Sequence, residues 1–142
     1  MPGRPDQLRA MVISAVMAAM ALILPPAFHA AGLGSRFLPM FLPLLVNGFL
    51  VPFPWAVLTG VLTPLVSSLA TGMPPLFPPV ALTMALEGAV LGGVSAAIYQ
   101  GRRSRLWWAL LSAVALGRAA TFASTWMLAQ VFRMPPRSRQ PP

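Results

Sequence analysis

The 142 residues suffice for one compact domain; 57% of them are hydrophobic and only 8% are charged, with a mean hydropathy of +0.75. This composition excludes an ordinary soluble domain and indicates an integral membrane protein. The net charge of +8 comes from ten arginines, most of them at the ends of apolar segments, a placement that suits lipid headgroups and argues against nucleic acid as a partner.

The first apolar segment predicts a membrane-spanning helix from about Arg9 to Leu24, because Pro25 and Pro26 interrupt the pattern there. Residues 1–9 form an extension that the positive-inside rule assigns to the cytoplasm. A cleaved secretory signal is the alternative, but the rest of the chain is itself apolar, which favours a retained span. His29 falls in the following loop, as an ordinary interfacial residue or as a ligand contact. Small residues on one face of this helix allow close packing inside the bundle or docking of another protein: Ala10, Ser14, Ala15, Ala18 and Ala19.

A second, shorter helix is predicted from about Phe37 to Val51, where Pro39 and Pro43 favour a kink or a re-entrant course. Its Asn47 can bond to a neighbouring helix or contact a solute. A third helix is predicted from about Trp55 to Thr71. Hydroxyls spaced four residues apart along it either bond to carbonyls of their own helix or line a polar cavity: Thr59, Thr63, Ser67 and Thr71.

The fourth helix is predicted from about Val80 to Tyr99, after a stiff apolar loop at residues 72–79. It carries a stripe of small residues that suits tight helix contact: Gly88, Gly92 and Ala96. Glu87 lies beside this stripe, and residues 37–86 before it contain no charged side chain. A carboxylate inside an apolar segment either takes up a proton or needs a cationic partner.

The fifth helix is predicted from about Leu106 to Phe132 and carries Arg118 near its middle, with Thr121 and Thr125 on the same face. This face is expected to point into the protein, because an arginine facing lipid at that depth costs roughly 2.5–3.5 kcal/mol. Glu87 and Arg118 are therefore expected either to pair as a brace between helices or to await the charged groups of a ligand. The Pro/Arg tail at residues 133–142 is expected to be disordered.

The arginines predict a cytoplasmic N-terminus, which also places those of residues 102–105 inside, together with Tyr99, Trp107 and Trp108. An odd number of spans then leaves the arginines of the tail outside, against the same rule. Either one span is re-entrant or the bundle is one helix short, and the sequence leaves this open.

Several short motifs are shared with one family: Phe37-Leu38-Pro39-Met40, Leu42-Pro43, Asn47-Gly48-Phe49, Thr63-Pro64-Leu65, the loop from Gly72 to Pro78, Met84-Ala85-Leu86-Glu87 and Gly117-Arg118. In these the chain resembles the substrate-binding S components of energy-coupling factor (ECF) transporters, over about residues 10–125. The resemblance implies a small helical bundle, usually of six helices, that captures a vitamin or similar micronutrient on the outer side of the membrane. A separate transmembrane coupling protein and two ATPase subunits supply the energy. It further implies docking through Ala15 and Ala19, and loops at His29–Arg36 and Gly72–Pro79 that cover the solute.

Taken together, the sequence predicts an all-α membrane protein, a compact bundle of about five transmembrane helices within residues 10–132, acting as the capture subunit of an ECF-type nutrient importer in the plasma membrane. The expected solute contacts are Glu87, Arg118, Asn47, Met73, Phe77, His29 and Thr121, with Met73 to Phe77 as an apolar lid. No cofactor or metal is expected, because one histidine, two acids and no cysteine do not build a typical transition-metal site. The alternatives are a membrane scaffold with a similar bundle that only recruits partners and, more distantly, an intramembrane enzyme that uses Glu87 as acid or base.

Overall fold

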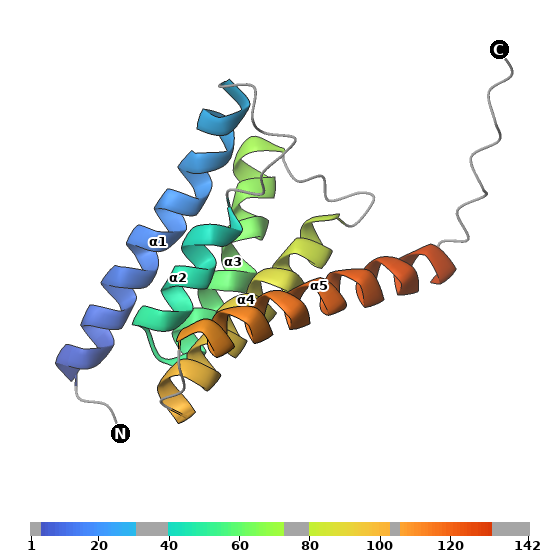
Figure 1. Ribbon diagram of the computed structural model, residues 1–142. Coiled ribbons are helices and arrows are strands. Elements are labelled where there is room, and N and C mark those ends of the chain that lie inside the picture. Colours follow the sequence, from blue (N-terminus) through green and yellow to red (C-terminus); the bar gives the residue numbers. More distant parts are fainter. Residues whose placement is uncertain (1–3, 31–39, 73–79, 103–105, 132–142) are drawn as a thin grey trace, which may run out of the picture.

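The structure, a computed structural model, describes residues 4–30, 40–72, 80–102 and 106–131. These residues form five helices, which confirms the predicted number: α1 (Arg4–Ala30), α2 (Phe41–Leu50), α3 (Phe53–Thr71), α4 (Val80–Arg102) and α5 (Leu106–Val131). Successive helices run up and down, so that α1, α3 and α5 begin at the end of the bundle where α2 and α4 finish (Figure 1). The result is an all-α bundle with α4 in contact with α2, α3 and α5.

Four of these helices, α1, α3, α4 and α5, are long and apolar enough to cross a membrane. By contrast α2 has 10 residues and a length of about 15 Å at 1.5 Å per residue, half of what a hydrocarbon core requires. Its Pro43 lies in the first helical turn, where a missing N–H interrupts no intrahelical bond. The expectation of a second segment shorter than the others is therefore confirmed.

The predicted end of the first helix at Leu24 is wrong, because α1 continues through Pro25 and Pro26 to Ala30. Each proline removes one backbone donor, but the remaining helical bonds stay available, and apolar surroundings offer the backbone no other partner. The backbone of His29 therefore belongs to the last turn of α1 and not to a loop. The helix also begins earlier than expected, at Arg4.

The closest packing in the bundle joins α3 to α4 through glycines. A Cβ added at Gly60 would collide with the backbone of Gly88, and one added at Gly92 would lie 2.8 Å from the carbonyl oxygen of Ala56. Because Pro64 has no N–H, the Gly60 carbonyl lacks its usual intrahelical donor, and this carbonyl is the atom that approaches Gly88. The predicted small stripe of α4 is thus a contact seam in which the two backbones nearly touch.

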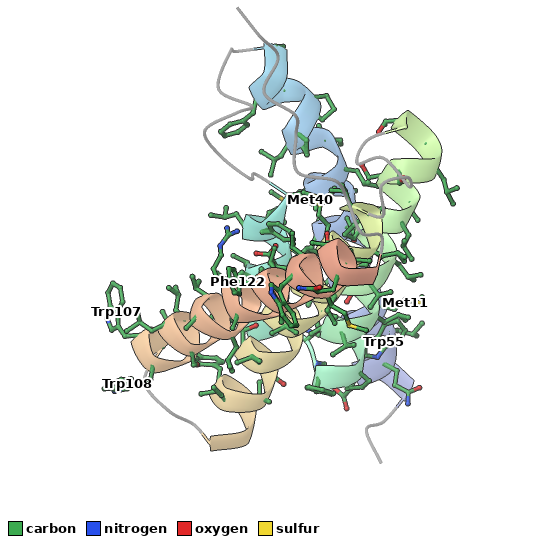
Figure 2. The ribbon with its side chains drawn as sticks, turned by 90° about the vertical axis from the view of Figure 1, so that its right-hand side faces the viewer. Met11, Met40, Trp55, Trp107, Trp108 and Phe122 are labelled. Atoms are coloured by element: carbon green, nitrogen blue, oxygen red, sulfur yellow. The ribbon has the colours of Figure 1, made fainter. Side chains whose placement is uncertain are left out.

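Helix α5 is held much less closely than α4. Half of the α4 span is buried, compared with 17% of the α5 span. In Figure 1, α5 crosses α4 obliquely and its second half projects beyond the other helices. Trp107 and Trp108 extend outward from its first turn and are largely exposed (Figure 2). One side of α5 therefore has no neighbour among the described residues.

Candidate functional site

The site begins with Glu87, which α4 holds beside its glycine seam. Gly88 faces α3, so the preceding residue is turned toward α5. There Gly117 has no side chain, and a Cβ at that position would lie 3.8 Å from Cγ of Glu87. The absence of a side chain at Gly117 lets the backbone of α5 come close to the carboxylate, and the next residue along α5 is Arg118.

Glu87 and Arg118 form an ion pair, with 3.2 Å between Nη1 of the arginine and Oε1 of the glutamate. The sequence left open whether these two residues pair or stand apart, and the structure pairs them. The Glu87 side chain is only 4% exposed, whereas that of Arg118 is 57% exposed. The pair is therefore strongly asymmetric: its acid is enclosed by protein and its base is accessible.

This exposure contradicts the expectation that the Arg118 face of the helix points into the protein. The physical reason is the position of α5, which packs chiefly against α4 and leaves its other flank open. Thr125 on the same face is also exposed, and its hydroxyl donates to the Thr121 carbonyl at 2.7 Å. Thr121 is half-buried and donates to the Gly117 carbonyl at 3.1 Å. Neither hydroxyl donates to the ion pair.

Asn47 is completely buried, and neither Nδ2 nor Oδ1 of its amide has a hydrogen-bond partner among the described residues. Such an amide lacks the compensation that buried polar groups normally find. The expected bond to a neighbouring helix is thus not formed, and the amide is not bonded to the Glu87–Arg118 pair either. The hydroxyl of Ser14 on α1 is also buried and has no hydrogen-bond partner among the residues that the structure describes.

The hydroxyls of α3 follow the simpler of the two predicted alternatives. Thr63 donates to the Thr59 carbonyl and Thr59 to the Trp55 carbonyl, each at 2.7 Å. Thr71 donates to the Ser67 carbonyl at 2.8 Å. These hydroxyls satisfy their own helix, so they give no support for a polar cavity along α3.

A groove of about 290 Å³ runs between α1 and α3 and is lined almost entirely by apolar atoms. Ala15 lies in its wall, and Met11 and Trp55 border it on the same side of the molecule (Figure 2). Ala19 is exposed, while Ala10 is buried. The small-residue face of α1 is therefore divided, with one edge packed inside the bundle and the other free.

The remaining predicted contacts cannot be placed. Met73 and Phe77, and with them the proposed lid, lie outside the described residues, as does most of the loop from His29 to Arg36. The side chain of His29 is also outside them. Among the described residues, no group of three metal-ligating side chains is present.

Three polar or small residues that pack α4 against α2 and α3 were not predicted from the sequence. Gln100 donates from Nε2 to the carbonyls of Val51 at 2.6 Å and Gly48 at 3.2 Å, so it holds the end of α2 against α4. Ser95 donates to the Gly92 carbonyl at 3.0 Å. Gly60 was overlooked although it follows Ala56 by four residues, a spacing of small residues that indicates close helix packing.

Four long apolar helices with an ion pair between two of them define a multi-pass membrane protein. The family model described as "ECF transporter, substrate-specific component" matches residues 9–136. The chain therefore belongs to the substrate-specific components of ECF transporters, as the motifs predicted. No curated protein and no solved structure gave a significant match.

Membership fixes the general role of the chain. It is the substrate-capture subunit of an ECF importer, and its family works with a coupling protein and ATPase subunits on a small-molecule substrate. The family consists of transporter components and not of enzymes.

Proposed function

We propose that this subunit captures a vitamin-like micronutrient on the outer side of the cell membrane, with its N-terminus in the cytoplasm. In this proposal the Glu87–Arg118 pair is the polar anchor of the solute. Small-molecule sites are mostly apolar with a few polar groups that orient the ligand, and an ion pair between apolar helices suits that role. The proposed topology places residues 1–9 in the cytoplasm, on the same side of the membrane as Tyr99, Trp107 and Trp108.

The observation that carries this proposal is the accessibility of Arg118. A pair that served only to brace two helices would be best enclosed on both sides, because exposed ion pairs contribute little stability. Here the Arg118 side chain is 57% exposed near the middle of an apolar helix. A bound solute that accepts hydrogen bonds from the remaining N–H groups of Arg118 would stabilise the exposed guanidinium.

The other predicted contacts surround this anchor in the proposal. Asn47 offers an amide without a partner, and Thr121 lies one turn beyond Arg118 on α5. Met73 and Phe77 would cover the solute as an apolar lid, and His29 would approach from the end of α1. These roles derive from the family resemblance and from residue chemistry.

Docking on the coupling protein is assigned to the free edge of α1. Ala15 borders the groove beside α3 and Ala19 is exposed, so a partner helix can approach both positions closely. Replacing either residue by leucine should prevent co-purification with the coupling protein and the ATPase pair. Val16→Leu is the matched control, because Val16 is an exposed α1 residue that is already large.

The test of the proposed function is uptake of a panel of radiolabelled vitamins by cells that express this chain with its coupling and ATPase subunits. Glu87→Gln and Arg118→Gln should both abolish uptake while co-purification with the partners is kept. Ser112→Ala is the control on α5, because the Ser112 hydroxyl only bonds to carbonyls of its own helix. Full uptake by both charge-removing variants would show that the pair is only a brace, and failure to co-purify with any ATPase pair would indicate a scaffold.

A further inference from the structure

We infer that the solute carries a carboxylate, which binds the edge of the Arg118 guanidinium that faces away from Glu87. This inference rests on the proposed function, because it assigns a chemical class to the solute of that site. It starts from the two exposed fractions, 57% for Arg118 and 4% for Glu87. An approaching molecule meets the base of this pair and not the acid.

The accessible charge decides the sign of the solute. A cationic solute would have to pass the arginine to reach the enclosed carboxylate, and like charges at short range repel. A neutral solute can accept charge-assisted hydrogen bonds from the guanidinium, but it lacks the Coulomb attraction between opposite charges. An anion gains both the hydrogen bonds and this attraction.

The geometry of the unused Arg118 donors suits a carboxylate. A guanidinium has about five N–H donors in a planar fork, and the structure uses one end of this fork, where Nη1 faces Oε1 of Glu87. The fork matches the two oxygens of a carboxylate, so one arginine can join two carboxylates at different edges. Glu87 then fixes the orientation of the guanidinium and the solute occupies its free edge.

Nothing else on the described part of α5 competes for that edge. The hydroxyls of Thr121 and Thr125 donate to carbonyls of their own helix. Phe122, one turn beyond Arg118, is 76% exposed and apolar. Since α4 carries no acid besides Glu87 and α5 carries none, no second carboxylate from either helix can reach the arginine.

The test measures binding of acids and their uncharged counterparts to the purified full chain in lipid nanodiscs. The probes are nicotinic acid with nicotinamide, pantothenic acid with pantothenyl alcohol, and biotin with biotin amide. We expect one acid to bind at least about tenfold more tightly than its neutral counterpart, the size of one lost charged hydrogen bond. This arm needs no variant, so it does not depend on the folding of a mutant.

Variants then connect the preference to Arg118. Arg118→Gln should remove the difference between acid and neutral compound, Arg118→Lys should keep part of it because the charge remains without the fork, and Ser112→Ala should leave it unchanged. Equal or tighter binding of the neutral compound overturns the inference, and so does a panel in which no acid binds. If the chain still co-purifies with an ATPase pair in those cases, the proposed function stands and only the carboxylate is rejected. If neither binding nor co-purification is found, both fail.

Discussion

The contact of α4 with α3 and its contact with α5 are built in opposite ways. Toward α3 the backbones nearly touch, because Gly60 and Gly88 leave no side chain between them. Toward α5 the close approach at Gly117 is limited by the end of the Leu91 side chain, 2.9 Å from a Cβ placed there. One contact is between rigid backbones and the other is against a side chain that can move.

This difference supports placing the proposed solute site at the contact with α5 and not at the contact with α3. A seam of glycines fixes α3 and α4 with respect to each other and has no room for a ligand. The contact with α5 is looser, carries the only two charges of these helices outside their terminal turns, and leaves one of them accessible. Helices α3 and α4 thus form a rigid pair that holds Glu87 in place, and Arg118 approaches it from α5, which is less constrained.

The largest effect should come from filling the seam. Gly60→Ala places a methyl group against the backbone of Gly88, which cannot move aside, and should lower the free energy of unfolding by about 3 kcal/mol. Gly117→Ala is the matched substitution at the looser contact, where Leu91 can turn away and alanine favours the helix, so its effect should be below about 1 kcal/mol. Equal losses for the two variants in micellar unfolding would remove the distinction between the contacts.

A smaller effect should follow from breaking the ion pair, and it should depend on which partner is removed. Arg118→Gln leaves a buried carboxylate without a cation and should cost about 2 kcal/mol, less than the roughly 3–5 kcal/mol of a fully buried pair. Glu87→Gln leaves an arginine whose side chain is already 57% exposed, so about 1 kcal/mol or less is expected. Both are measured as free energies of unfolding, and the reverse order would contradict the observed asymmetry.

Replacing Asn47 by an apolar residue should raise the stability of the protein but weaken its binding of the solute. Asn47→Leu removes two buried polar atoms without partners and should raise the free energy of unfolding by about 1 kcal/mol. If the amide contacts the solute as proposed, the same variant should weaken solute binding. A stabilised variant with unchanged binding would place Asn47 outside the solute site.

The smallest effect is expected within α3. Thr63→Val replaces a hydroxyl that bonds only to its own helix, so the free energy of unfolding should change by less than about 0.5 kcal/mol and uptake should persist. Loss of uptake in this variant would show that α3 lines the solute site after all, and would move the site from α5 to the groove between α1 and α3, which Thr63 lines.

The sequence was sufficient for the helices, because apolar segments bounded by charge and proline have few other structures available in lipid. It misplaced the end of α1, since the proline rule describes a cost that an apolar helix can bear. Pairing of Glu87 with Arg118 was one of the two predicted alternatives, and so was the bonding of Thr59 and Thr63 to their own helix.

The exposure of Arg118 could not be predicted in the same way. Spacing along a helix shows which residues share a face, but not which neighbour covers that face. The oblique course of α5 past α4 depends on the contacts of Gly117 and Leu91, which belong to two segments distant in sequence. The hydrogen bonds of Gln100 to the carbonyls of Gly48 and Val51, at the end of α2, also join segments that are distant in sequence.

The most direct test of the solute site is mass spectrometry of the small molecules that remain bound to the purified chain. Wild type and Ser112→Ala should retain the same molecule, with a carboxylate in its structure, and Arg118→Gln should lose it although the protein is folded. An Arg118→Gln preparation that is folded and retains the same molecule in the same amount would contradict the assignment of the solute to this ion pair.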